Sequence, residues 1–162
     1  MKRNGVYMPQ AANMVKLKYD CNLEISARDK AQSCLTDENT DTSYQENLHV
    51  VPKANVMDRP DAMRQGVMQW WKQVRIDSPI GMQVTFRAFH ANMPVRSFTR
   101  MAWAETTKIG CAVKSCEPNW HVVCHYSPPG NKIMQKIYIP GNPCSACPAG
   151  TTCDYGLGLC IQ

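Results

Sequence analysis

The sequence predicts a small α+β protein that is held together by disulfides. Apolar residues recur at three- and four-residue spacing in several stretches, which predicts helices, whereas Ile109–Lys114 and His121–Tyr126 alternate or run apolar, as paired strands do. Nine cysteines in 162 residues, four of them among the last nineteen, indicate an oxidising compartment. At 162 residues the chain is large enough to form one domain with a buried core. Its 44% of hydrophobic residues excludes a disordered chain.

The first half of the chain predicts two helices and one strand. Between Asp20 and Cys34, apolar residues at 23, 27 and 31 form one stripe, which predicts a core-facing helix. Residues 35–45 are polar and acidic and predict a loop, which leads into a short strand at Glu46–Val51. Asp58-Arg59-Pro60-Asp61 starts a second helix, whose apolar stripe continues to about Arg75.

The second half predicts a helix followed by a strand pair. An irregular connection over 82–96 leads to a short helix from Ser97 to about Thr106, for which Ser97 is a good N-cap. The two strands named above follow, joined by a turn at Pro118-Asn119. Lys132–Pro140 predicts a loop with a brief strand at Ile137–Ile139, and a tail rich in glycine and cysteine occupies 141–162.

Charge and hydropathy exclude several classes of protein. The net charge is +5, but the basic residues are scattered and form no run interleaved with aromatics, so we expect no nucleic-acid partner. No apolar stretch approaches the length that spans a membrane. The N-terminus also lacks the apolar core of a signal peptide, so we expect the sequence to be a mature or truncated form of a secreted protein.

The spacing of the cysteines restricts how they pair. Cys21 and Cys34 lie thirteen residues apart on one predicted helix, hence ~20 Å apart. A disulfide needs Cα atoms within ~7 Å, so these two cannot pair with each other. Cys111 and Cys124 lie about equally far from the predicted turn, so we expect them to face each other across the strand pair.

The tail cysteines allow three connectivities, of which we prefer Cys144–Cys153 with Cys147–Cys160. The C-x-x-C at 144–147 could instead belong to a zinc ribbon, but the second pair is spaced by six residues and the other cysteines already indicate oxidation. Cys21 is left over. It is predicted to be free, to form an intermolecular bond, or to pair with a segment that precedes this sequence.

Two motifs resemble the signatures of the CAP superfamily, which comprises cysteine-rich secretory proteins, antigen 5 and pathogenesis-related 1 proteins. Arg96–Trp103 resembles the first signature, usually His-Phe-Thr-Gln-Met-Val-Trp, and His121–Asn131 matches every fixed position of the second. The second signature is missed only at Lys132, where an apolar residue, Asp or Asn is usual. With Tyr19-Asp20-Cys21 and the tail, the chain looks most like the venom allergen-like or activation-associated secreted proteins of parasitic worms.

The resemblance implies a three-layer α-β-α sandwich with a central antiparallel sheet. Residues 1–140 would form the CAP domain and 141–162 a cysteine-rich, hinge-like tail. The family's first helix should precede the connector at 1–19, so that helix is expected to be absent. The same relatives imply a bridge from Cys34 to Cys116.

In CAP domains a central cleft holds two His and two Glu, which can bind a divalent ion. Glu46 stands at one of the two Glu positions, and Gln73 stands at the other. Ser97 stands at one of the two His positions, and Glu38 and Asn39 lie near the second His position. Zinc prefers imidazole and carboxylate ligands, so we predict that the metal site is absent. An alternative recruits His49, His90 or Glu38 as substitute ligands.

The function that the resemblance implies is non-enzymatic. We expect a secreted effector or immunomodulatory ligand of a host extracellular or cell-surface protein, with no cofactor. The alternative is a hydrolase that uses Ser97 as nucleophile with a His and Glu46, although no nucleophile motif surrounds Ser97. His121 and His125 belong to a strand motif and are expected to be structural.

The family also includes proteins described as sterol or fatty-acid binders. Here the connection over 82–96 supplies Phe86, Phe89 and Met93 as lipid-binding candidates, although their spacing differs from the motif proposed for sterol binding. The competing interpretation places the same three side chains in the core beneath this connection.

Overall fold

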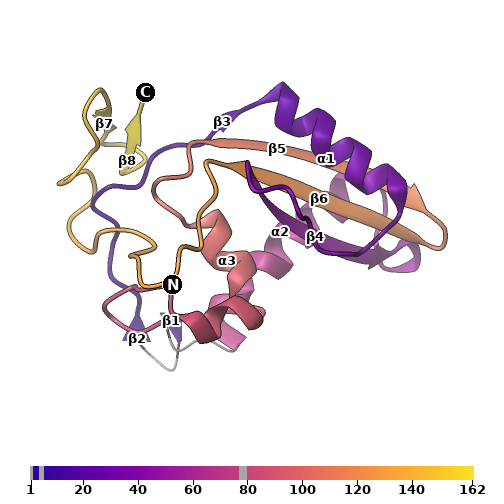
Figure 1. Cartoon of the computed structure of the whole chain (residues 1–162), viewed down its shortest axis with the longest axis horizontal. Coiled ribbons are helices and arrows are strands. Elements are labelled where there is room, and N and C mark those ends of the chain that lie inside the picture. The colour runs from indigo at the N-terminus through magenta and orange to yellow at the C-terminus, as the bar shows by residue number, and fades with distance from the viewer. Residues whose placement is uncertain (1, 4–5, 77–79) are drawn as a thin grey trace.

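The fold is a three-layer α-β-α sandwich, as predicted. The computed structural model describes residues 2–3, 6–76 and 80–162. In this part of the chain, the main sheet has the strand order β3-β5-β6-β4, formed by Lys18–Tyr19, Lys108–Cys116, Asn119–Ser127 and Gln45–Pro52. Helix α1 (Cys21–Ser33) covers one face, while α2 (Arg59–Ile76) and α3 (Arg96–Met101) cover the other (Figure 1). The sheet is antiparallel except that β3 pairs in parallel with β5.

Both long helices form where the apolar pattern predicts them. The Asp20 carboxylate caps α1 by accepting from the N–H groups of Asn22 and Leu23. Ala27 and Ala31 then pack against Val123 of the sheet. On the opposite face, α2 approaches the sheet so closely at Gly66 that an added Cβ would lie 2.8 Å from a methyl group of Val122.

The short helix differs from its prediction. It begins at Arg96 and ends at Met101, and Val95 occupies the N-cap position without a side-chain hydrogen bond. Ser97 lies inside the first turn, where its hydroxyl donates to the carbonyl of Pro94 over 2.8 Å. The prediction that Ser97 caps this helix is therefore wrong, because the turn before the helix already places a carbonyl within reach of the hydroxyl.

The connections around α3 bury a second core, which includes Val84, Phe86, Trp103 and Ile137. The connection before α3 contains the short 3-10 turn η2 at Ala88–Asn92, whereas η1 at Lys53–Asn55 lies between β4 and α2. The strand predicted at Ile137–Ile139 does not form. Instead, Ile137 is buried, its N–H donates to Val84, and its carbonyl accepts from Ala104. Phe86 adds two backbone hydrogen bonds, with Met134 and Gln135, and Thr85 forms an isolated antiparallel bridge with Lys136. The loops are thereby joined without a continuous strand ladder.

The tail packs against the connector that precedes β3. After the short strands β1 (Lys2–Arg3) and β2 (Val6–Tyr7), the connector exchanges backbone hydrogen bonds with Cys160, through the carbonyl of Met14 and the N–H of Lys16. Cys160 lies in the hairpin β7–β8, formed by Thr152–Asp154 and Leu159–Ile161. Figure 1 shows this hairpin beside the connector, at the end of the sheet that carries β3.

Four disulfides join eight of the nine cysteines. They pair Cys34 with Cys116, Cys111 with Cys124, Cys144 with Cys153, and Cys147 with Cys160, which are the pairs that the sequence and the resemblance led us to expect. The first ties the end of α1 to the sheet, and the second crosses from β5 to β6. Cys21 is free and exposed.

Candidate functional site

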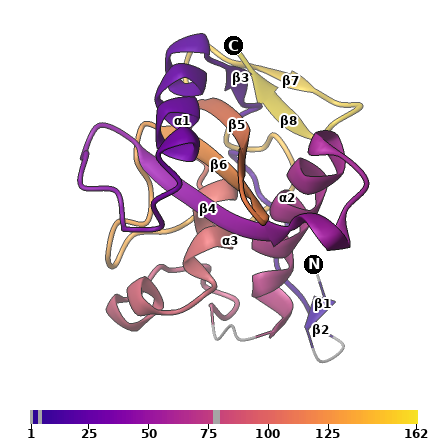
Figure 2. The same cartoon turned by 90° about the vertical axis from the view of Figure 1, so that its right-hand side faces the viewer.

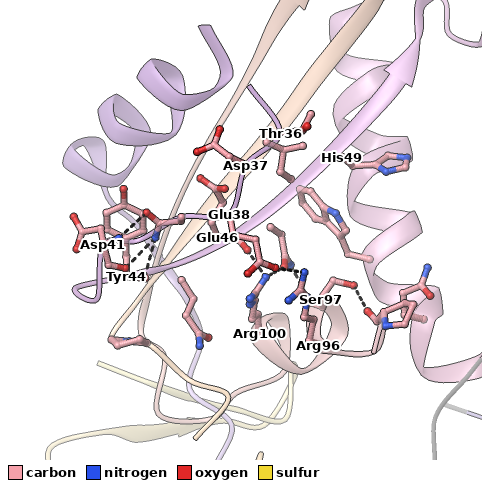
Figure 3. Close-up of a pocket in the computed structure, with 18 of the residues that line it drawn as sticks. Thr36, Asp37, Glu38, Asp41, Tyr44, Glu46, His49, Arg96, Ser97 and Arg100 are labelled. Atoms are coloured by element: carbon pink, nitrogen blue, oxygen red, sulfur yellow. Dashed lines mark hydrogen bonds and ion pairs between the residues drawn. The ribbon is translucent and has the colours of Figure 1, made fainter. Parts of the chain in front are cut away.

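A cavity of about 580 Å³ lies beside β4. Its walls come from the loop that follows α1, from α2 and from α3 (Figure 3). The lining residues are Thr36, Asp37, Glu38, Asn39, Asp41, Thr42, Tyr44, Gln45, Glu46, Asn47, Leu48, His49, Gln69, Trp70, Gln73, Pro94, Arg96, Ser97, Arg100 and Pro129. The four residues that the resemblance assigns to the tetrad of family ligand positions, Glu38, Glu46, Gln73 and Ser97, all line this one cavity.

The cavity lies along the outer edge of β4 rather than over one face of the sheet. Leu48 packs with Ala27 and Ala31 on the α1 side, whereas Val51 packs with Trp70 on the α2 side. Successive side chains of a strand point to opposite faces, yet residues 45–49 all line the cavity. β4 is also the last strand in the sheet order, and Figure 2 shows it on the outside of the sheet.

Two of the tetrad positions carry neutral side chains, and both form hydrogen bonds to backbone carbonyls. The amide of Gln73 donates to the carbonyl of Gln69, one turn earlier in α2, over 3.0 Å. The hydroxyl of Ser97 donates to Pro94. Glu38 forms an ion pair with Arg96, so its carboxylate is also committed.

Glu46 belongs to a hydrogen-bonded chain of three side chains, of which Glu46 and His125 are buried and Ser26 is partly buried. Its Oε2 lies 2.8 Å from Nε2 of His125, and Nδ1 of the same ring lies 2.7 Å from Oγ of Ser26 on α1. The Ser26 hydroxyl also reaches the carbonyl of Leu23 over 3.0 Å. Tyr44 stacks on the imidazole with 4.1 Å between ring centroids. Sequence reasoning missed this chain because its members are 79 and 99 residues apart.

Arg100 brings a positive charge into the cavity. Its Nη1 donates to the backbone carbonyl of Glu46 and, over 3.4 Å, to Oδ1 of Asn47. Burial of the guanidinium lowers the pKa of Arg100 to about 10, and Nε has no acceptor among the described residues. A signal for this residue was present, since Arg100 stands where the first family signature usually has Gln.

These donors do not fit a zinc ion. A guanidinium lines the site, and two of the family's ligand positions carry an amide and a hydroxyl. Of the proposed substitutes, His49 lines the cavity but lies apart from Glu46 (Figure 3), and burial lowers the pKa of its imidazole. His90 is fully buried in the second core, and its Nδ1 accepts from the N–H of Arg87.

The described residues contain one group of cysteine, histidine or carboxylate atoms close enough to share a metal. It consists of Cys144, Cys147 and Cys160, and all three form disulfides. A zinc ribbon in the tail is therefore inconsistent with the pairing, because a sulfur in a disulfide is no thiolate ligand.

The lipid-binding candidates separate into two kinds. Phe86 is 1% exposed and contacts Trp103 edge-to-face in the second core, and Met93 packs against the same core. The structure therefore contradicts a surface role for Phe86. Phe89 is 46% exposed and packs against the ring of His90, so it is the one candidate whose ring reaches solvent.

A comparison with protein families identifies the fold independently. Residues 3–126 match the model of the CAP family, described as the cysteine-rich secretory protein family. The chain belongs to this family. In this CAP chain Glu46, Gln73 and Ser97 line one cavity.

Several known CAP proteins are similar to this chain. It is 33% identical to the Ancylostoma secreted protein of Ancylostoma caninum over 96% of its own length, but it spans only 38% of that relative. It is 30% identical to hookworm platelet inhibitor 1 of the same organism, covering 90% of this chain and 68% of the relative. It is also 32% identical to peptidase inhibitor 16 of Bos taurus, of which it spans 32%.

Solved structures of CAP proteins superpose on most of the chain. BmVAL-1 is 31% identical with a TM-score of 0.90, covering 100% of this chain and 84% of that one. NaASP2 with Zn²⁺ is 32% identical with a TM-score of 0.84, covering 94% and 79%. The described part of this CAP chain has no helix with the length and apolar character to cross a membrane.

Proposed function

We propose that this CAP chain is a secreted, non-enzymatic effector that acts by binding a host extracellular or cell-surface protein. Disulfides and similarity to a secreted protein and a platelet inhibitor support this proposal. The observation that carries it is the state of the cavity. Gln73 and Ser97 replace two of the family's polar ligands, and both are hydrogen-bonded to backbone carbonyls rather than free to react.

A direct binding assay tests the proposal. Labelled protein is added to intact platelets and leukocytes, and bound label and cell activation are measured by flow cytometry. Saturable binding with an altered activation response is expected, and a Ser97→Ala variant should bind and act as the wild type does. Reduced and alkylated protein is the control for non-specific adhesion. Absence of saturable binding, or loss of the cellular effect in Ser97→Ala while its binding is retained, would contradict a non-enzymatic binding role.

The chain Ser26–His125–Glu46 is the observation that favours a hydrolase as the second candidate. It contains the three groups of a catalytic triad, with the Ser26 hydroxyl and the Glu46 carboxylate 2.7 Å and 2.8 Å from the two ring nitrogens of His125. However, Glu46 rather than Ser26 lines the cavity, so the hydroxyl that would attack does not face the space where a substrate would lie. Ester and peptide hydrolysis by the wild type, abolished by Ser26→Ala in a folded protein, would establish this candidate and exclude the first.

Lipid binding is the third property that the family resemblance implies, and here it depends on Phe89. A Phe89→Ser variant should lose any sterol binding while its melting temperature changes little, because the ring is half exposed. Phe86→Ser should instead unfold the second core, since Phe86 is buried. Sterol binding that survives Phe89→Ser would exclude this loop as the site.

A further inference from the structure

The outer edge of β4 has backbone groups that the sheet does not use. The direction of these groups follows from the neighbouring strands. Cys111 and Cys124 face each other across β5 and β6 with 4.1 Å between their Cα atoms. Pairs that exchange hydrogen bonds lie about 5.5 Å apart and the alternate pairs about 4.5 Å apart, so this is a pair without hydrogen bonds between its members.

A second contact supports this assignment. The Cys111 carbonyl accepts from the hydroxyl of Tyr19 in β3, so it points away from β6. Cys124 must then direct its N–H and C=O toward β4, where its partner is Asn47. Residues that alternate with Asn47, namely Glu46 and Leu48, therefore direct their N–H and C=O groups outward.

Arg100 confirms the outward direction at one of these residues, because its guanidinium donates to the carbonyl of Glu46. Leu48 is different. Its outward direction excludes hydrogen bonds to β6, and within residues 2–3, 6–76 and 80–162 its N–H and C=O form no hydrogen bond outside the strand ladder. Since residues 45–49 line the cavity along this edge, the free donor and acceptor of Leu48 face it.

The charges around this edge indicate what could fill the cavity. Four carboxylates line it, on Asp37, Glu38, Asp41 and Glu46, against two guanidinium groups, on Arg96 and Arg100. The Asp37 and Glu38 carboxylates are largely exposed at 66% and 73% although each is ion-paired. The rim is therefore acidic, and it favours a positively charged occupant.

We propose that the cavity binds an extended, basic peptide segment, which adds to β4 as a further strand through the N–H and C=O of Leu48. This inference rests on the proposed function, since it supplies the site by which the chain would recognise a partner protein. Strand addition takes affinity from backbone hydrogen bonds and specificity from alternate side chains. Here the partner's alternate lysine or arginine side chains would meet the Asp37, Glu38 and Asp41 carboxylates. The added strand would pair with β4 over a short length, because the carbonyl of Glu46 already accepts a hydrogen bond from Arg100.

The first test uses three synthetic probes and the wild-type chain labelled with ¹⁵N. The probes are acetyl-Val-Lys-Val-Lys-Val-amide, an analogue of it that is N-methylated on alternate residues so that the donors of one edge are lost, and the glutamate analogue acetyl-Val-Glu-Val-Glu-Val-amide. The lysine peptide is expected to shift the Leu48 amide resonance and to slow its hydrogen exchange. The other two peptides should bind about tenfold more weakly or worse, because one lacks backbone donors and the other has the wrong charge.

A second test changes the protein. Leu48→Pro removes the outward N–H while leaving the ladder to β6, as proline on an edge strand allows, and Leu48→Val is the matched control. Peptide binding should be lost in the first and kept in the second. Equal binding of the N-methylated peptide, or saturation without a shift at Leu48, overturns the proposal, and these peptide arms decide it even if Leu48→Pro fails to fold.

The same experiments separate this site from the proposed function. If labelled protein binds cells but none of the peptides binds, the effector role stands and the β4 site is wrong. If the lysine peptide binds and pairs with Leu48 but cells are not bound, the site stands and the proposed cellular role is wrong.

Discussion

The His125 imidazole and the Glu46 carboxylate lie 2.8 Å apart in the interior, with side-chain exposures of 0% and 7%. A buried ring nitrogen that loses its only partner keeps the full cost of desolvation. We therefore expect Glu46→Ala to lower the free energy of unfolding by about 2–3 kcal/mol, measured by urea titration.

Glu38→Ala is the matched control for this change. Glu38 lines the same cavity, but its ion pair with Arg96 is exposed, and such pairs contribute at most about 1 kcal/mol. Equal losses in the two variants would show that the interior contact between His125 and Glu46 is not stabilising.

The second prediction concerns acid sensitivity. Burial, and then the charge of Lys30, lowers the pKa of His121 below its ordinary 6.5, and Lys114 lies opposite it on β5. The unfolded chain therefore binds this proton more readily, so stability should fall as the pH drops below about 6.5 and level off once the folded-state pKa is passed.

A His121→Gln variant should lose less stability between pH 7 and pH 5 than the wild type. Urea midpoints measured at both pH values give the comparison. His49→Gln is a useful companion, because burial also lowers the pKa of His49. An identical pH dependence in the wild type and His121→Gln would mean that His121 does not contribute.

Third, the two disulfides of the sandwich should differ in what they contribute. Cys34 and Cys116 are 82 residues apart in sequence, and Cys111 and Cys124 are 13 apart. Because closing a longer loop removes more entropy from the unfolded chain, the Cys34→Ser/Cys116→Ser variant should lose about 1–2 kcal/mol more stability than Cys111→Ser/Cys124→Ser. Denaturant titration of both variants decides it, and the reverse order would exclude loop entropy as the main cause.

Fourth, the wild type should bind zinc weakly, because Gln73 and Ser97 are poor ligands and Arg100 lines the cavity. Restoring the family's side chains in Gln73→Glu/Ser97→His should raise the affinity at least about tenfold by calorimetry, with Gln73→Glu alone as the control. Submicromolar binding by the wild type that Glu46→Ala abolishes would contradict this prediction.

Fifth, Cys21 should react as the single accessible thiol of the native protein, because it is free and exposed while the other cysteines form disulfides. Titration with a thiol reagent without denaturant should give about one equivalent, and none in Cys21→Ser. A native protein without a reactive thiol, whose mass shows a Cys21 bridge, would disprove the pairing.

Local sequence pattern was sufficient for the elements that contain their own signal. The 3.6-residue apolar stripes of 21–33 and 59–76 and the apolar strands around Cys111 and Cys124 predicted both long helices and the central hairpin, because helix and strand periodicity reflect burial directly. Spacing alone also excluded a Cys21–Cys34 bridge. The altered cavity ligands Gln73 and Ser97 were found by position in a motif, without coordinates.

The tertiary structure decided what depends on partners distant in sequence. Ser97 was predicted as a cap because serine suits that position, but the turn at Pro94 bound its hydroxyl instead. Ile137 was predicted in a strand but is held by single hydrogen bonds between loops. The contact of His125 with Glu46 and the outward edge of Leu48 arise only when β4 pairs with β6, since strand order and register are set by the packing of the whole sheet and leave no mark in the local sequence.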